Sequence, residues 1–192
     1  MFIHDWKKEV FTIPNFLSLF RIALIPVYVF IYLNASHIHD YYLAGSILAV
    51  SCLTDLIDGK IARQFHMIST LGKILDPVAD KLTQITLTLC LSAKYPVLRY
   101  VLILFVIKEG FQAAAGMIYL RSGSILPGAL YAGKICTAIL FLSLIILVLI
   151  PDLKSELVMF IAILDTAFLL VSFLSYIRAY WGQNSKLQKL ED

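Results

Sequence analysis

The feature that most constrains the fold of this chain is a series of six apolar stretches, each long enough to cross a membrane. A helix of about 20 apolar residues spans the hydrocarbon core of a bilayer. Charged residues make up 15% of the chain, against roughly 25% in soluble domains, which favours the same interpretation. The predicted spans are Ile13–Leu33, Tyr42–Ile61, Gly72–Ala93, Val97–Leu120, Leu130–Ile150 and Leu157–Tyr180.

These spans take up most of the chain, so we predict a single all-α integral membrane domain over residues 1–192. Its core is a bundle of six transmembrane helices at 13–180. In residues 1–12, apolar side chains alternate with charges at roughly helical spacing. This pattern predicts a short juxtamembrane amphipathic helix, and a frayed polar tail is the alternative. Residues 181–192 are polar and are expected to form a cytoplasmic tail.

The distribution of positive charge predicts how the chain is oriented. If both termini lie on one side, the loops of the opposite side carry few cations, namely Lys94, Arg99 and Lys154. Most of the remaining Lys and Arg residues then lie with the termini. Because cytoplasmic loops are rich in Lys and Arg, we expect a multi-pass protein of the cytoplasmic membrane with both termini in the cytoplasm.

Four aspartates close to two of the spans break the apolar pattern. Asp55 and Asp58 are three residues apart, and Asp76 and Asp80 are four apart, so each pair shares one face of a helix. A carboxylate near the bilayer centre costs about 2.5–3.5 kcal/mol on insertion scales. A short connection makes the two helices antiparallel, which allows the two acidic faces to meet at the cytoplasmic end of the bundle.

Such a group of carboxylates is typical of a site for hard cations. Mg²⁺ and Mn²⁺ prefer oxygen ligands, and no His or Cys is suitably placed for zinc. Four carboxylates can hold two ions, and a two-ion clamp suits displacement at phosphorus. Arg63 lies on the same side and can pair with a carboxylate or a phosphate. The alternative is a set of ordinary solvated charges at two helix ends.

The spacing of these residues resembles a known family signature. The pattern Asp55-x2-Asp58-Gly59-x2-Ala62-Arg63-x8-Gly72-x3-Asp76-x3-Asp80 is similar at every position to that of the CDP-alcohol phosphotransferases. The segment Pro14-Asn15-Phe16-Leu17-Ser18 with Arg21, and the segment Leu75–Lys81, resemble the phosphatidylglycerophosphate synthases and their cardiolipin-synthase relatives. The length and the six predicted spans agree with the resemblance.

The resemblance implies a reaction and a set of site residues. An alcohol attacks the lipid-bearing phosphorus of CDP-diacylglycerol, and CMP leaves. By position, the metal ligands correspond to Asp55, Asp58, Asp76 and Asp80, and Asp80 is also the general base. The cytidine diphosphate site corresponds to Asp58, Gly59, Ala62, Arg63 and Gly72. The expected cofactor is Mg²⁺ or Mn²⁺, as two ions. The expected assembly is a homodimer in lipid, without a nucleic-acid partner.

The acceptor alcohol is the less constrained part of the prediction. Overall resemblance favours sn-glycerol 3-phosphate, whose phosphate requires cations, and the candidates are Arg21, Lys108, Arg121 and Lys134. Phosphatidylglycerophosphate synthases usually have Arg where this chain has Lys108, and further cations near Gly116 and Cys136. These departures keep phosphatidylglycerol open as the acceptor, as in cardiolipin synthases, followed by inositol phosphate, serine and other alcohols.

Two structural alternatives and one functional alternative accompany the hypothesis. Lys108 and Glu109 interrupt an apolar run and can form an ion pair that ties helices together, and Arg121 at a span end can extend toward the interface. A cation transporter also uses intramembrane acids. The acids here gather at one face, however, and the repeated halves typical of transporters are absent from the sequence.

Overall fold

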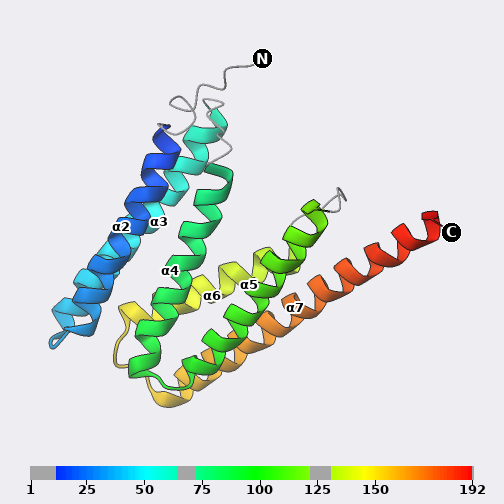
Figure 1. The fold of residues 1–192 in the computed structure, drawn as a ribbon. Coiled ribbons are helices and arrows are strands. Elements are labelled where there is room, and N and C mark those ends of the chain that lie inside the picture. The colour runs from blue at the N-terminus through cyan, green and yellow to red at the C-terminus, as the bar shows by residue number, and fades with distance from the viewer. Residues whose placement is uncertain (1–11, 65–71, 122–130, 192) are drawn as a thin grey trace. The chain divides into compact units, whose positions relative to one another are not determined.

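Six α-helices make up the part of the chain that the computed structural model describes, which is residues 12–64, 72–121 and 131–191 (Figure 1). The described residues contain no strand, so the all-α prediction is confirmed. The predicted amphipathic helix at 1–12 lies outside the described residues apart from Thr12. In chain order the helices are α2 (Ile13–Leu33), α3 (Ile38–Gln64), α4 (Gly72–Lys94), α5 (Leu98–Arg121), α6 (Tyr131–Leu149) and α7 (Ser155–Glu191).

Four of the described helices are long and apolar enough to cross a membrane. They are α2, α5, α6 and α7, and their apolar windows run over Asn15–Leu33, Leu98–Ile118, Tyr131–Leu149 and Ser155–Trp181. Helices α3 and α4, which carry the aspartates of the motif, are not among the four. The structure therefore supports a membrane-spanning chain, and the count of six spans stays a prediction.

The start of α2 is fixed by its own sequence. The side chain of Thr12 accepts a hydrogen bond from the backbone N–H of Asn15 at 3.4 Å, and Pro14 lies in the first turn. Both features are typical of a helix N-terminus. At the other end, the side-chain amide nitrogen of Asn34 donates to the backbone carbonyl of Phe30 at 2.7 Å. These contacts fix where α2 begins and ends.

Helices α3 and α7 are longer than the sequence predicted. Helix α3 begins at Ile38, four residues before the predicted Tyr42, because the carboxylate of Asp40 accepts hydrogen bonds from the backbone N–H groups of Ser36 and His37. Helix α7 continues to Glu191, so the predicted tail at 181–192 is helical as far as that residue. Polar Lys, Gln and Glu residues are good helix formers, although an apolar count ignores them.

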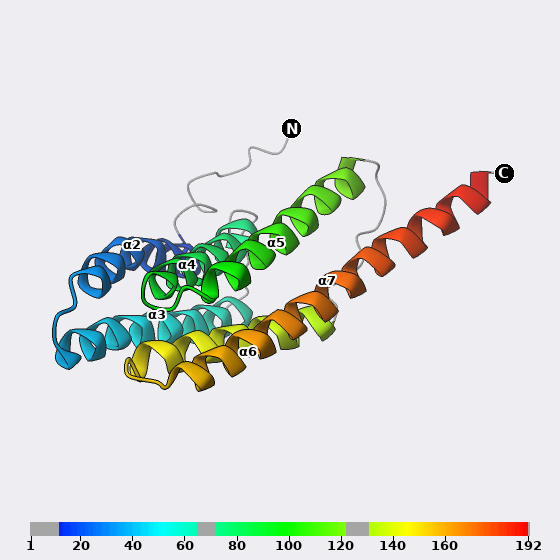
Figure 2. The same ribbon diagram turned by 90° about the horizontal axis from the view of Figure 1, so that it is seen from below.

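The described residues fall into two compact units. The first holds α2, α3 and α4 as far as Cys90, together with Leu147–Pro151. Helices α2 and α3 lie side by side over much of their length (Figures 1 and 2). Gly45 allows the end of α6 to approach α3, since a Cβ at this glycine would lie only 2.7 Å from a methyl carbon of Leu149.

The second unit holds α5, the part of α6 before Leu147, and α7. Helix α5 packs along α7. Helix α6 is joined to α7 by a buried hydrogen bond, in which the Ser143 hydroxyl donates to Oδ1 of Asp165 at 2.9 Å. Such an interhelical bond satisfies polar groups that have no access to water inside an apolar span.

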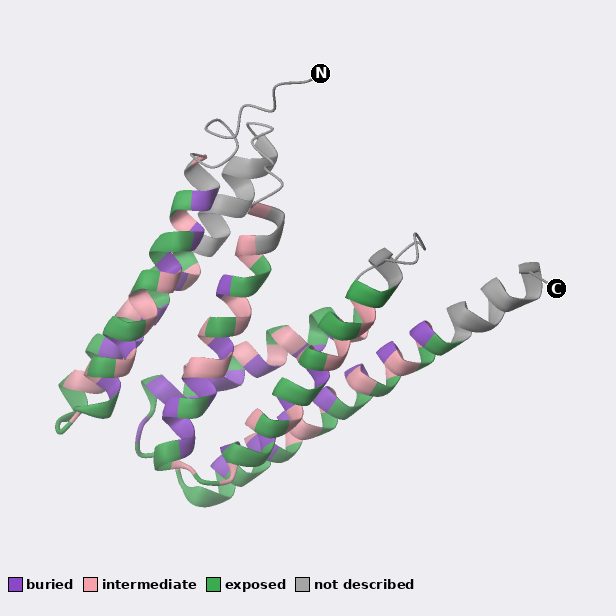
Figure 3. Cartoon of the chain, in the orientation of Figure 1, coloured by how far each residue is buried: buried purple, intermediate pink, exposed green. Residues whose placement is uncertain are grey.

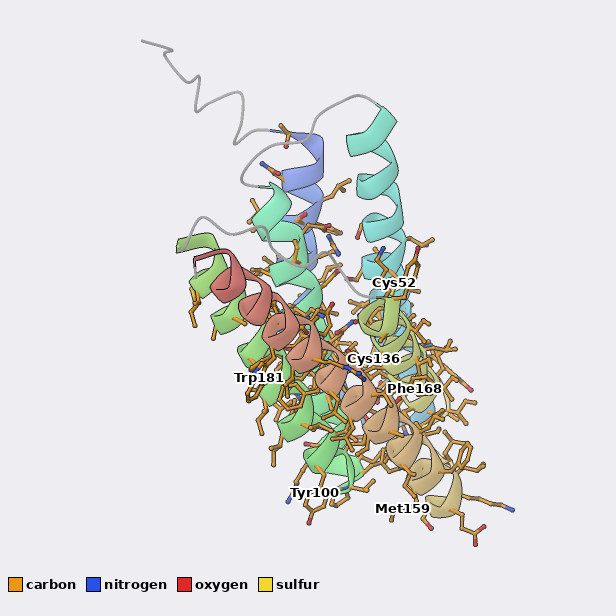
Figure 4. The ribbon with its side chains drawn as sticks, turned by 90° about the vertical axis from the view of Figure 1, so that its right-hand side faces the viewer. Cys52, Tyr100, Cys136, Met159, Phe168 and Trp181 are labelled. Carbon is orange, nitrogen blue, oxygen red and sulfur yellow. The ribbon has the colours of Figure 1, made fainter. Side chains whose placement is uncertain are left out.

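Burial follows stripes along each helix, and Figure 3 shows buried residues recurring between exposed ones. Many large apolar side chains remain exposed, including Phe16, Phe30 and Ile163. Tyr100, Met159 and Trp181, labelled in Figure 4, are exposed as well. Exposed apolar stripes of this extent are unfavourable in water, and they suit helices that face lipid.

Candidate active site

An arginine from α2 meets two aspartates of α4 in the first unit. Arg21 donates from Nη1 to Oδ1 of Asp80 at 2.6 Å, and from Nη2 to Oδ1 of Asp76. The arginine side chain is only 3% exposed, whereas the aspartates are 46% and 44% exposed. The two carboxylates therefore converge on one positive group that approaches them from the protein interior.

The helix geometry explains why the two carboxylates meet at one point. Asp76 and Asp80 are one turn apart, so their side chains lie on the same face of α4. Gly72 is one turn earlier and is the first residue of the helix. Pro77 lies between the aspartates and has no N–H, so the carbonyl four residues before it lacks its helical partner. The predicted common face of Asp76 and Asp80 is confirmed by their shared contact with Arg21.

Apolar packing closes the inner side of the arginine. A cavity of about 20 Å³ lies beside Arg21 between α2, α3 and α4, with room for a single water molecule at most. Its lining is largely apolar and includes Leu24, Leu48 and Leu87. The guanidinium therefore contacts polar atoms on the side of the aspartates. The partly exposed carboxylates form the side of the Arg21–Asp76–Asp80 cluster that solvent can reach.

The oxygen donors of Asp76 and Asp80 fit a hard divalent cation. Both side chains offer oxygen donors, which such an ion prefers, and Arg21 contacts Oδ1 of each carboxylate. Asp55 and Asp58 lie one turn apart within α3, as predicted, but their side chains are outside the described set. Among the side chains that are described, no three Asp, Glu, His or Cys residues gather at one point.

The residues predicted to bind cytidine diphosphate lie at the end of α3 and the start of α4. Gly59, Ala62 and Arg63 are within the helical part of α3, which runs to Gln64. Their side chains, like those of Asp55 and Asp58, are not described. Gly72 begins α4. The helical spacing assumed in the prediction is therefore confirmed, while the contacts of these residues stay a prediction.

Two buried polar residues on α2 received no role in the sequence prediction. Asn15 and Ser18 are both buried, and with Arg21 they recur every three residues in an otherwise apolar helix. That spacing places all three on one side of α2. The recurrence of polar residues is visible in the sequence, and it marks the side of α2 that faces the aspartates.

The other predicted acceptor-binding cations lie in the second unit. Lys108 of α5 is buried, and its Nζ lies 2.7 Å from Oε1 of its neighbour Glu109. This ion pair is within one helix, so the pair itself does not join two helices. Lys134 of α6 is exposed, with Nζ 5.7 Å from the ring centroid of Tyr131. Arg121 ends α5, and its side chain is not described.

The sequence matches one protein family over most of its length. Residues 11–174 match the family described as CDP-alcohol phosphatidyltransferase. The chain belongs to this family. The match covers α2 to α6 and α7 as far as residue 174, so the resemblance extends well beyond the aspartate motif.

Relatives within the family have two different names. A Mycobacterium tuberculosis protein provisionally named as a cardiolipin synthase is 34% identical over 132 residues, which is 68% of this chain and 61% of that protein. The cardiolipin synthase (CMP-forming) of Streptomyces coelicolor is 31% identical over 67% of this chain and 61% of its own length. The CDP-diacylglycerol–glycerol-3-phosphate 3-phosphatidyltransferase of Bacillus subtilis is 30% identical over 67% of this chain and 72% of its own length.

The chain thus matches about three fifths of the mycobacterial and Streptomyces relatives. The Streptomyces relative is named for cardiolipin synthesis with formation of CMP. The Bacillus relative is named for phosphatidyl transfer between CDP-diacylglycerol and glycerol 3-phosphate. Family membership therefore supports a membrane-integral transferase and leaves the acceptor to be decided by the chemistry of the site.

Proposed function

We propose that this protein is a divalent-metal-dependent phosphatidyltransferase of phospholipid synthesis. It moves the phosphatidyl group of CDP-diacylglycerol to a hydroxyl of sn-glycerol 3-phosphate and releases CMP. The observation that carries the proposal is the convergence of Asp76 and Asp80 on Arg21, within the family's aspartate motif. Phosphoryl transfer depends mainly on positioning and charge neutralisation. The two carboxylates offer ligands for a metal ion, and the guanidinium offers a positive charge.

The proposed chemistry forms one phosphorus–oxygen bond and breaks another. The acceptor hydroxyl oxygen bonds to the phosphorus that carries the lipid, while the bond from that phosphorus to the bridging oxygen breaks. CMP leaves with the bridging oxygen, and Asp80 takes the hydroxyl proton. A general base must lie within hydrogen-bond reach of that proton, and Asp80 is 44% exposed, so an alcohol can approach it.

Four aspartates are proposed to hold Mg²⁺ or Mn²⁺, as two ions. Asp76 and Asp80 supply one half of the ligand set and Asp55 and Asp58 the other half. Bound metal would neutralise the phosphate oxygens and the leaving group. Arg21 then balances any carboxylate charge that remains, and its buried stem keeps it in place. Asp58, Gly59, Ala62, Arg63 and Gly72 are proposed to hold the cytidine diphosphate.

A second candidate acceptor is phosphatidylglycerol. The identity to the mycobacterial and Streptomyces cardiolipin synthases favours it, as does the absence of Lys or Arg at Gly116 and Cys136. Both acceptors present a glycerol attached to a phosphate, free in one case and within a lipid in the other. Arg21, Lys108, Arg121 and Lys134 are the cations proposed to receive that phosphate.

The proposal includes the arrangement of the chain in the membrane. Helices α3 and α4 are proposed to cross the bilayer with the four more apolar helices, so that six spans form one domain. Both termini and the aspartates then lie at the cytoplasmic face, as the positive-inside rule favours. We also propose a homodimer, and crosslinking in native membranes that yields monomer alone would contradict it.

The test is an acceptor screen with purified protein. CDP-diacylglycerol and Mg²⁺ are combined with glycerol 3-phosphate, phosphatidylglycerol, inositol phosphate or serine, and CMP and the lipid product are identified by mass. CMP release that needs both metal and glycerol 3-phosphate supports the leading proposal. CMP release only with phosphatidylglycerol replaces it by the second candidate. If no acceptor yields CMP, the proposed activity is rejected.

A further inference from the structure

A tyrosine of α7 contacts both of the other helices in the second unit. The Nζ atom of Lys108 on α5 lies 5.9 Å from the ring centroid of Tyr176, within the distance of about 6 Å over which a cation interacts with an aromatic face. A Cβ built on Gly133 of α6 would lie 2.6 Å from the Tyr176 hydroxyl oxygen. The tyrosine therefore meets α5 with its ring and α6 with its hydroxyl end.

The contact with α6 depends on a missing side chain. The same Cβ on Gly133 would also lie 2.8 Å from the Cε2 ring carbon of Tyr176, a distance that real Cβ atoms essentially never show. Any residue larger than glycine would therefore displace the ring. Gly110 on α5 offers a contrast, because a Cβ there would meet no atom within 4 Å. The observed position of the Tyr176 ring therefore requires a glycine at position 133.

Neighbouring aromatic rings hold the tyrosine in place. The ring of Tyr180 stacks on that of Tyr176 with centroids 6.4 Å apart. Phe111 of α5 packs edge-on against Tyr180 at 6.0 Å and against Phe173 at 5.3 Å. Tyr176 and Tyr180 are both buried, with Phe111 packed against them. A ring enclosed in this way gives Lys108 a fixed surface.

The lysine beneath the ring keeps capacity for a further partner. An ammonium group has three donors, and the contact with Glu109 at 2.7 Å uses one of them. The side chain of Lys108 is 2% exposed and that of Glu109 is 18% exposed. An anion that binds Lys108 therefore competes with Glu109 for an ammonium whose position is set by Tyr176. Lys134, the next candidate cation, directly follows Gly133 in the chain.

We propose that Tyr176 is a positioning residue of the acceptor site. Its ring orients the ammonium of Lys108, and its contact with Gly133 fixes that ammonium relative to the start of α6, where Lys134 lies. The ligand class is an anionic alcohol phosphate, and the proposal rests on the proposed function of Lys108 in binding the acceptor. Tyr176 itself does not touch the reacting atoms.

The test measures Michaelis constants for the two substrates separately. Tyr176→Leu removes the aromatic face and is expected to raise the KM for the acceptor roughly tenfold, with the KM for CDP-diacylglycerol within about twofold of wild type. Tyr176→Phe keeps the face and is expected to stay near wild type. Gly133→Ala is expected to follow Tyr176→Leu. The matched control is Gly110→Ala, which adds the same methyl group at a position where a Cβ would meet no atom within 4 Å.

A double variant separates positioning from packing. In a Lys108→Met background, Tyr176→Leu is expected to add no further increase in the acceptor KM, since the group that it positions is gone. Additive effects of the two substitutions, or equal shifts of both Michaelis constants in Tyr176→Leu, would show a purely structural tyrosine and overturn the proposal. If Gly133→Ala does not fold, the comparison of Tyr176→Phe with Tyr176→Leu carries the test.

The variants also distinguish a wrong role for Tyr176 from a wrong role for Lys108. If Lys108→Met leaves the acceptor KM unchanged, Lys108 does not bind the acceptor and the inference falls with it. If Lys108→Met raises that constant and Tyr176→Leu does not, only the role of Tyr176 is rejected. Wild-type protein that releases no CMP rejects the proposed function before either variant is compared.

Discussion

Arg21 and Asp80 are 59 residues apart in the chain, and their side chains meet at 2.6 Å between Nη1 and Oδ1. The arginine is buried and the aspartate is about half exposed, so the pair joins the interior of the first unit to its accessible edge. Asp76 completes the group on the same arginine. The balance of one guanidinium against two carboxylates leaves a net negative charge, which favours a cation from solution.

Loss of Arg21 should destabilise the metal-free protein. Arg21→Met leaves two neighbouring, half-exposed carboxylates without their cationic partner, at an expected cost of about 1 kcal/mol. The measurement is the melting temperature in detergent with a chelator, compared with that in excess Mg²⁺. Magnesium should recover part of the loss because it supplies positive charge to the same oxygens. The control is Arg99→Met at an exposed position, and equal melting of Arg21→Met and wild type in chelator would contradict the prediction.

Replacement of Asp80 should remove turnover without unfolding the protein. Asp80→Asn keeps the shape of the side chain but cannot accept the proton of the acceptor, so CMP release should fall by roughly 10²–10⁴-fold. Release is measured with CDP-diacylglycerol and the preferred acceptor, beside a melting curve that checks folding. Asp152→Asn, at a position with an 88% exposed side chain, is the matched control. An active Asp80→Asn variant would remove the assignment of the base.

The hydrogen bond from Ser143 of α6 to Asp165 of α7 should contribute more to stability than a serine bond within α7. Ser143→Ala leaves Oδ1 of a buried carboxyl group without its donor, and the expected loss of stability is about 1–3 kcal/mol. Ser175→Ala is the control, because the Ser175 hydroxyl donates only to the Val171 carbonyl of its own helix. Thermal unfolding followed by the loss of soluble protein compares the two. Equal losses of stability in the two variants would show that the interhelical bond contributes no additional stability.

The stability that Asp40 contributes at the start of α3 should decrease at acid pH. Backbone N–H groups of His37 and Ser36 donate to Asp40 and hold the pKa of that carboxyl below its ordinary value. The charged form is therefore favoured by folding, so its stabilisation is complete above the unfolded pKa of about 3.9 and is lost as pH falls through the folded pKa. Asp40→Ala should melt below wild type at pH 7, and this difference in melting temperature should shrink as the pH falls below about 4. A difference that stays constant over this range would exclude the cap as its cause.

The helices were largely predictable because apolar runs in a membrane protein are long and unbroken. The bounds of α2 are the same as predicted, since Thr12, Pro14 and Asn34 end the apolar run with capping residues. Helix α7 is the clearest difference. Its last turns contain polar residues that favour a helix without being apolar, so hydropathy alone placed its end at Tyr180 instead of Glu191.

The site was predictable only where its residues are neighbours on one helix. Spacing alone placed Asp76 and Asp80 on a common face, and the structure agrees. Spacing carries no information about Arg21 as their partner, because that contact depends on how α2 packs against α4. The same limit applies to Lys108 and Tyr176, which are 68 residues apart and meet only through the packing of α5 on α7.

The length of α7 has a practical consequence for experiments. Its apolar window ends at Trp181, and the helix continues for ten more residues to Glu191, a rise of about 15 Å. A fluorescent protein fused to the C-terminus would therefore sit on a helical spacer instead of being pressed against the headgroups. Such a fusion offers a convenient ruler, since energy transfer to dyes in either leaflet reports directly which side of the bilayer the C-terminus occupies.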